Sequence, residues 1–194
     1  MSELGNKLID GSESSLRAFL DNLPGVDKVG AEGRAAMLGT RSIKTTSKAR
    51  AIDLAISMVD LTTLEGADTP GKVRSLCAKA LRPDPSDLTV PHVGAICVYN
   101  DMVKVARDYL DSIGGQSIPV AAVSTAFPSG RASMEVKLRD TQDAIESGAS
   151  EIDMVIDRGA FLSGKFGSVF DEIREIKALC GEKDRKSTRL NSSH

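Results

Sequence analysis

The sequence predicts an α/β fold in which short parallel strands alternate with helices. Three observations lead to this prediction. Short apolar runs rich in β-branched residues recur along the chain, each is followed by apolar residues at helical spacing, and equivalent strand positions lie 27 to 37 residues apart. The chain has 194 residues, 41% of them hydrophobic, which is enough for one globular domain with a sizeable core.

The N-terminal part, residues 1–50, is predicted to be a helical extension packed on the outside of the first strand–helix units. Its apolar residues at helical spacing are Leu16, Phe19, Leu20 and Leu23, and Pro24 ends this face. The segment 48–57 continues the pattern and is also predicted to be a helix. Fifty residues are too few to suggest a separate domain.

The first strand–helix unit follows this extension. Residues 58–63 form a predicted strand, and Thr69 followed by Pro70 is typical of an N-cap and a first helical residue. The helix that begins there ends at the sequence RPDPSD. Its predicted buried stripe consists of Val73, Leu76, Cys77 and Ala80.

Three further strands are predicted at residues 93–99, 118–124 and 151–156. Strands that alternate with helices favour a parallel sheet. A repeat near 30 residues fits either a (β/α)8 barrel or an open doubly wound sheet, and spacing does not choose between them. The sequence has neither GxGxxG nor GxxxxGK[ST] after any strand, which disfavours a nucleotide-binding open sheet.

The helices between these strands carry recognisable ends. Asn100 is a predicted N-cap, and Gly114 and Gly148 are predicted to end the second and third helices. Ser168 and Asp171 have the spacing of a capping box and are predicted to begin the fourth.

Composition excludes several classes of function. A net charge of −2 gives no basic surface for nucleic acid, and no apolar run approaches the roughly 20 residues of a membrane span. The N-terminus has no signal-peptide pattern. Cys77, Cys97 and Cys180 are odd in number and widely spaced, which favours a reducing cytoplasm. Two histidines, His92 and His194, cannot form a histidine-based metal cluster.

Polar residues interrupt the predicted strands in a pattern. Because strand side chains alternate between faces, Asp60 and Thr62 share one face, and Glu151 and Asp153 share one. Asp153 and Asp60 are either catalytic or buried carboxylates that cap the backbone or pair with a cation. Cys97 reads as a small buried hydrophobe, and Glu151 as a structural or rim charge.

Four segments in order resemble deoxyribose-phosphate aldolase, a class I aldolase family. They are VDLTTLEGADTPGKVRSLCAKA, GAICVYNDMVKVARDYL, IPVAAVSTAFPSG and GASEIDMVIDRGAFLSGKF, and the resemblance runs from about residue 45 to 183. It implies a (β/α)8 TIM barrel, of which residues 51–183 would form the first half with about four β/α units. It also implies cleavage of 2-deoxy-D-ribose 5-phosphate to D-glyceraldehyde 3-phosphate and acetaldehyde, in deoxyribonucleotide catabolism.

The resemblance also implies roles for single residues. Asp153 matches an active-site aspartate of a proton relay, Asp60 and Thr62 match positions that line the substrate pocket, and Cys97 matches the inner wall. The chemistry uses a lysine Schiff base and requires no metal and no cofactor. The expected partners are the phosphorylated sugar and, in a homo-oligomer, other copies of the chain.

The lysines of the family do not have counterparts in this sequence. KTSTG-type and GFKPAGG-type motifs are absent, and Lys137, Lys165 and Lys177 are interpreted as solvated surface charges. The chain by itself is therefore expected to be inactive. Two alternatives stay open, a non-catalytic half-barrel and a different barrel lyase.

Residues 184–194, DRKSTRLNSSH, are expected to be a non-native tail outside the fold. They match the translation of a sequencing-adapter sequence; a natural basic, Ser-rich tail is the alternative. Without a second half of the barrel, the inward face of the sheet should be open. We expect it to expose Val120, Ala122 and Val155 or their neighbours on the same face.

Overall fold

The computed structural model describes residues 11–181 and 188–190, and it divides the chain into two compact units, Met1–Ile52 and Asp53–His194. The first unit is helical as predicted. It holds α1 (Glu13–Asp21), α2 (Lys28–Gly39) and the first part of α3 (Thr45–Ser57). Of the predicted apolar face, Leu16 is buried in α1, whereas Leu23 lies beyond the end of that helix and is exposed.

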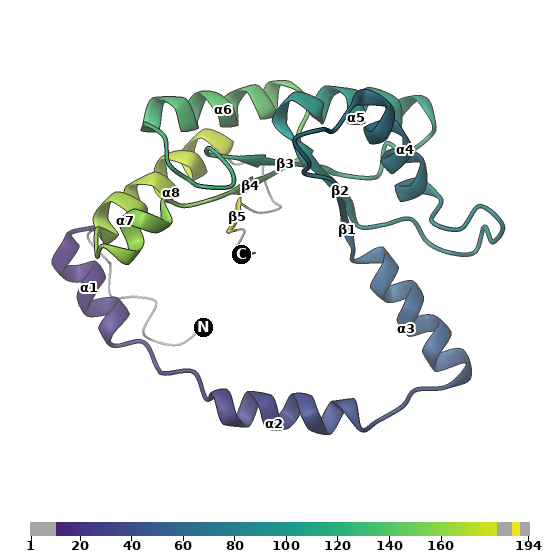
Figure 1. Ribbon diagram of the computed structural model, residues 1–194, viewed down its shortest axis with the longest axis horizontal. Coiled ribbons are helices and arrows are strands. Elements are labelled where there is room, and N and C mark those ends of the chain that lie inside the picture. Colours follow the sequence, from purple (N-terminus) through teal and green to yellow (C-terminus); the bar gives the residue numbers. More distant parts are fainter. Residues whose placement is uncertain (1–10, 182–187, 191–194) are drawn as a thin grey trace. The chain divides into compact units, whose positions relative to one another are not determined.

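The second unit is one parallel sheet with its strands in the order β1-β2-β3-β4-β5 (Figure 1). Its first four strand–helix units form half of a (β/α)8 barrel. Each of the four predicted strands is shorter than the predicted run by two or three residues. The elements are β1 (Asp60–Thr62), α4 (Pro70–Leu81), β2 (Ala95–Tyr99), the 3-10 helix η2 (Asn100–Met102), α5 (Val103–Ser112), β3 (Val120–Ser124), α6 (Met134–Glu146), β4 (Glu151–Met154), α7 (Arg158–Leu162), α8 (Phe166–Cys180) and β5 (Thr188–Leu190).

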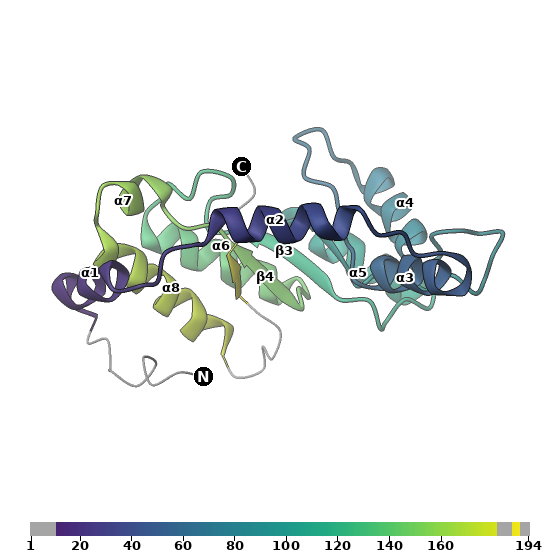
Figure 2. The same cartoon turned by 90° about the horizontal axis from the view of Figure 1, so that it is seen from below.

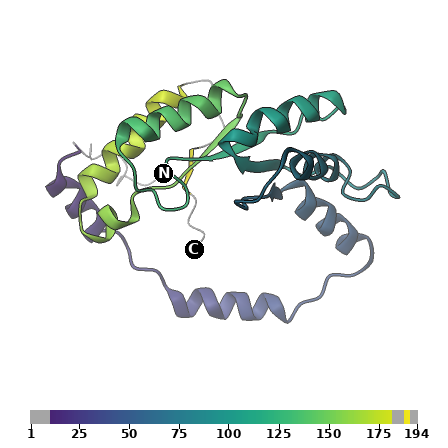
Figure 3. The same cartoon turned by 45° about the horizontal axis from the view of Figure 1, so that its top comes forward.

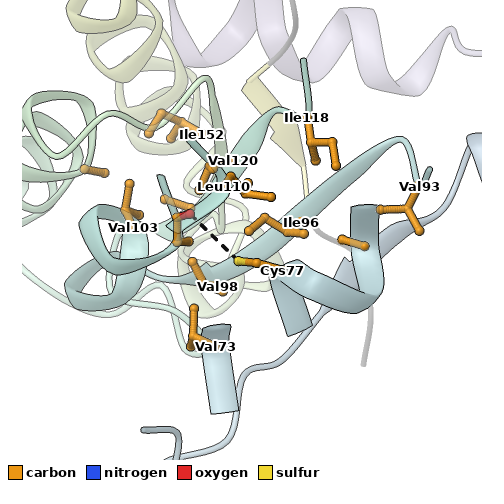
Figure 4. Packing of buried hydrophobic residues seen from close by; sticks show 14 residues of the cluster. Val73, Cys77, Val93, Ile96, Val98, Val103, Leu110, Ile118, Val120 and Ile152 are labelled. Carbon is orange, nitrogen blue, oxygen red and sulfur yellow. Dashed lines mark hydrogen bonds between the residues drawn. The ribbon is translucent and has the colours of Figure 1, made fainter. Parts of the chain in front are cut away.

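Helices α4, α5 and α6 cover one face of the sheet, and α8 lies beside α6 (Figures 1 and 3). Strands β3 and β4 run side by side, which the view from below also shows (Figure 2). The core between the sheet and these helices brings together side chains from β2, β3, α4 and α5 (Figure 4). Among them, Ile96, Val120 and Leu110 are completely buried, and the Cys77 thiol donates to the Ala106 carbonyl oxygen at 3.8 Å.

Some predicted helix ends are confirmed. Thr69 is the N-cap of α4 and accepts a hydrogen bond from the Lys72 N–H at 3.3 Å. Gly114 and Gly148 follow the ends of α5 and α6 with φ of 86° and 99°, a left-handed conformation that glycine adopts without a steric penalty.

Two predicted N-caps are wrong. Asn100 lies inside η2, and its side-chain amide donates to the carbonyl and carboxylate oxygens of Asp140 at 2.6 and 2.8 Å, so a tertiary contact replaces the local cap. Ser168 lies inside α8, which already begins at Phe166.

The prediction that residues 184–194 lie entirely outside the fold is wrong for one short segment. Thr188–Leu190 forms β5 and pairs in parallel with β4, with Arg189 opposite Asp153. Strand pairing uses backbone N–H and C=O groups that every sequence offers, so the free edge of β4 can accept such a segment. Its non-native origin stays a prediction, and the other residues of the tail lie outside the described part.

The predicted exposure of the sheet is also wrong. Val120 and Ala122 point toward the helices and are completely buried, and Val155 is buried as well. On the opposite face, Ala121 and Val123 are buried in a second, smaller cluster with Cys97. The alternation of strand side chains explains the first error, because Val120 and Ala122 occupy the helix-facing positions of β3.

None of the helices in the described ranges combines the length and the apolar character that a membrane-spanning segment needs.

Candidate active site

Four residues predicted from the sequence lie on the face of the sheet opposite to α4, α5 and α6. Asp60 and Thr62 come from β1, Cys97 from β2 and Asp153 from β4. The parallel register places Thr62 opposite Cys97, and Asp153 opposite Val123 of β3. Because alternate residues of a strand share a face, the register brings all four to the same side of the sheet.

Cys97 and Asp153 touch across the strand between them. The Cys97 thiol donates to Oδ2 of Asp153 at 3.7 Å, although the two residues are 56 positions apart in the sequence. Ala121 of β3, which lies opposite Cys97, carries only a methyl group and leaves space for this contact. Both partners are buried, with 3% of Cys97 and 8% of Asp153 exposed.

The electrostatics keep the Cys97 thiol protonated. Burial raises its pKa to about 12, and the hydrogen bond to Asp153 and the negative charges of Asp153, Asp60 and Glu151 raise it in the same direction. A thiol that does not ionise near neutral pH is a poor nucleophile. Cys97 therefore acts as a hydrogen-bond donor to the Asp153 carboxylate and not as a nucleophile.

The remaining residues of this face surround that pair. The Thr62 hydroxyl donates to the Asp60 carbonyl oxygen at 3.0 Å, and its side chain is exposed, whereas Asp60 is half-buried. Glu151 is buried with 5% exposed, so of the two predicted alternatives the rim charge is wrong and the structural charge remains. The face thus concentrates three carboxylates around a neutral thiol, an arrangement that can accept and return protons.

Comparison with known proteins assigns the chain to a family. The sequence pattern of the DeoC/LacD family aldolases matches residues 54–187. The chain belongs to this aldolase family. It is 37% identical to the deoxyribose-phosphate aldolase of Mus musculus over 155 residues, which are 76% of this chain and 48% of the mouse protein, and 36% identical to the human enzyme over the same length.

The chain thus spans about half the length of the curated relatives that it matches. Among the solved structures that share its fold are two aldolases. An aldolase called QR15 has a TM-score of 0.54 and 26% identity over 64% of this chain and 50% of that one. A tetrameric deoxyribose phosphate aldolase from Aeropyrum pernix has a TM-score of 0.51 and 23% identity over 66% of this chain and 50% of that one.

The loop after β1 of this aldolase half-barrel is held by Asp68, which the sequence did not single out. Its carboxylate accepts hydrogen bonds from the Thr63 hydroxyl at 2.9 Å and the Glu65 N–H at 3.0 Å, and it pairs with Lys72 at 2.6 Å. The Lys72 contact, followed by those to Glu65 and Thr63, lowers the pKa of Asp68. The loop that leaves Thr62 is therefore fixed close to the strand end.

The ends of β2 and β3 are joined by Asp140 of α6. Besides the Asn100 amide, it accepts the Ser124 hydroxyl at 3.3 Å and the Ala126 N–H at 3.4 Å. An open hollow of about 940 Å³ lies beside this junction. Tyr99 and Phe127, among the residues that line it, meet edge to face with ring centres 6.1 Å apart.

A side-chain hydroxyl continues the pairing of β3 with β4 beyond the point where their backbone ladder ends. Thr125 and Ala126 adopt left-handed backbone conformations with φ of 63° and 62°, which turn the chain away from β4. The Thr125 hydroxyl accepts the Val155 N–H at 2.8 Å and lies 2.7 Å from the Val155 carbonyl oxygen. It thereby holds the chain two residues beyond Asp153.

The interpretation of Lys137 as a solvated surface charge is wrong. Its ammonium lies 2.7 Å from Oε1 of Glu172, and only 4% and 6% of the two side chains are exposed. Lys165 and Lys177 are exposed, as predicted. Within residues 11–181 and 188–190, no lysine belongs to a strand.

Proposed function

We propose that the complete protein containing this chain is a class I deoxyribose-phosphate aldolase of deoxyribonucleotide catabolism. It would cleave 2-deoxy-D-ribose 5-phosphate to D-glyceraldehyde 3-phosphate and acetaldehyde through a lysine Schiff base. The observation that carries the proposal is the buried Asp153 carboxylate, hydrogen-bonded by Cys97 on the face shared with Asp60 and Thr62. The identity to mouse deoxyribose-phosphate aldolase supports the choice of substrate.

In this mechanism a lysine amine adds to the C1 aldehyde of the open-chain sugar and water leaves, which forms an iminium. Removal of the C3 hydroxyl proton then breaks the C2–C3 bond, releasing glyceraldehyde 3-phosphate and leaving an enamine. Protonation at C2 and hydrolysis return the lysine and release acetaldehyde. Asp153 would accept and return these protons through water, a role typical of a positioned carboxylate.

For the chain by itself we propose the alternative, a half-barrel without catalysis. Lys137 forms an ion pair with Glu172 on the helix side of the sheet, and the other lysines of the described ranges lie outside the strands. Enamine chemistry has no substitute for an amine nucleophile. The Schiff-base lysine would come from the part of the relatives' length that this chain does not span.

The cellular location and the oligomeric state of the complete enzyme are part of the same proposal. Cys77, Cys97 and Cys180 are not disulfide-bonded in the described residues, which agrees with a reducing, cytoplasmic location. We further propose a homo-oligomer, because the Aeropyrum pernix relative is tetrameric.

The test is an assay of the complete protein on 2-deoxy-D-ribose 5-phosphate with a chelator present. We expect full activity, because imine formation takes the place of a Lewis acid. Asp153→Asn should lower kcat by about 10²-fold or more while the fold is kept, and Glu151→Gln, a matched loss of charge two residues away, should be much milder. Activity lost to the chelator and restored by zinc, or an equal loss in both variants, would contradict the proposal.

A further inference from the structure

A buried ion pair between Lys137 and Glu172 joins α6 to α8. A buried ion pair contributes little net stability, because removing two charges from water costs about as much as their attraction returns. Apolar residues of similar size would hold α6 against α8 at least as well. The geometry of the pair therefore points to a use for its charges.

The second carboxylate oxygen of Glu172 binds the backbone between β4 and α7. While Oε1 receives the Lys137 ammonium, Oε2 accepts the backbone N–H of Asp157 at 3.2 Å. Asp157 is the last residue of the short loop between β4 and α7, and it caps that helix by accepting the Ala160 N–H at 2.9 Å. One buried carboxylate thus links α8 to the end of the loop between β4 and α7, four residues after Asp153.

The charge of Lys137 reaches the same loop. The hydrogen bond from Ala160 lowers the pKa of the Asp157 carboxyl, and the positive charges of Lys137 and Arg131 lower it further. Lys137 consequently favours the ionised form of the carboxylate that caps the helix after this loop.

The segment after Asp153 is therefore held at two points. Thr125 fixes the backbone of Val155 on one side, and Glu172 fixes the N–H of Asp157 on the other. Both contacts come from side chains, since β4 ends at Met154 and its ladder with β3 ends there too. A shift of this segment would move Asp153 relative to Cys97.

We propose that Lys137 and Glu172 are positioning residues for Asp153, acting through the Asp157 backbone. The proposal rests on the proposed function only for the importance of Asp153. Its structural content, that the pair sets the place of the Asp153 carboxylate, can be measured in this chain without any activity.

Two double variants of the full chain separate the hydrogen bond from the charges. Lys137→Met with Glu172→Gln removes both charges but keeps a side-chain oxygen that can accept the Asp157 N–H. Lys137→Met with Glu172→Leu removes that acceptor as well. Both replacements avoid leaving a buried charge without its partner, the change that most strongly destabilises a buried pair.

The readouts are amide hydrogen exchange at Asp157 and the ¹³C resonance of the Asp153 carboxyl group. We expect the Leu variant to exchange the Asp157 amide about 10-fold faster than the Gln variant, the effect of one lost hydrogen bond. The Asp153 resonance should move in the Leu variant and stay near its original position in the Gln variant. Asp68, in the loop after β1, serves as the control, and its carboxyl resonance should stay in place in both.

Three results would overturn the proposal. The Asp153 resonance could be the same in the two variants, or that of Asp68 could move as far. Loss of the fold in either variant would show that the pair is needed for structure alone. Failure of the complete protein to cleave deoxyribose 5-phosphate would refute the proposed function and leave these measurements intact.

Discussion

Gly130 lies in the loop between β3 and α6, at a position where an added side chain should destabilise the fold. Its φ of 70° is left-handed, and a Cβ built there would overlap the carbonyl oxygen of Ile156 and lie 2.6 Å from the carbonyl carbon. These are backbone atoms of the segment held between Thr125 and Glu172. They cannot move aside as the end of a flexible side chain can, so Gly130→Ala must displace one loop or the other.

Gly114 offers a matched control. Its φ of 86° is also left-handed, but among the described residues no atom beyond its two chain neighbours lies within 4 Å of the position its Cβ would take. Gly114→Ala should therefore cost only the left-handed strain, about 1 to 2 kcal/mol of unfolding free energy. Gly130→Ala adds the cost of overpacking, about 1 to 3 kcal/mol, and should be the more destabilising variant by that amount.

Equilibrium unfolding in urea, analysed by linear extrapolation with the slopes compared, measures both values in the full chain. Equal losses of stability in the two variants, within about 0.5 kcal/mol, would refute the reasoning, because the contact with Ile156 would then carry no cost. A loss larger for Gly114→Ala would refute it as well.

Three further predictions concern burial and charge. At pH 8 an alkylating reagent should label the half-buried Cys180 in the native chain. Cys97, whose pKa is raised to about 12, should be labelled only after denaturation. Mass spectrometry of the peptides would show the order of labelling, and early labelling of Cys97 would contradict its burial. Because the folded-state pKa of Asp68 lies below the ordinary 3.8, its ionised form stabilises the fold above that pH and the stabilisation is lost as pH falls through the folded pKa. Asp68→Asn should therefore weaken the dependence of stability on pH below about 4, and an unchanged acid unfolding curve would contradict this. Ile96→Ala, at a completely buried position, should cost about 2 to 5 kcal/mol in urea unfolding, whereas Leu88→Ala, with Leu88 76% exposed, should cost almost nothing; similar costs would show that the core is misplaced.

The shared face of the candidate site residues could be predicted because it depends on local rules, whereas their roles came from the family resemblance and stay predictions. Strand side chains alternate, and parallel strands in sequence order place equivalent positions next to one another. Asp60, Thr62, Cys97 and Asp153 therefore met on one face as expected. The contact between Cys97 and Asp153 needed the register as well, which the sequence does not state.

The residues that support the site were missed for the opposite reason. Lys137 lies in a polar stretch that resembles any exposed helix surface, and its burial depends on Glu172, 35 positions later. Asn100 has the sequence signature of a local cap, yet its side-chain amide donates to Asp140 of a later helix instead. Such partners are set by tertiary packing, and no window of the sequence contains both.

The central claim is that this chain supplies the proton-transferring carboxylate of a Schiff-base aldolase and that the lysine lies outside its described residues. The most direct measurement incubates the complete protein and this chain separately with acetaldehyde and borohydride, followed by mass spectrometry of intact protein and peptides. We predict one stoichiometric adduct in the complete protein, on a lysine beyond the segment shared with this chain, and no stoichiometric adduct in the chain. A single stoichiometric adduct on a lysine such as Lys137, together with turnover of deoxyribose 5-phosphate by the chain alone, would contradict the claim.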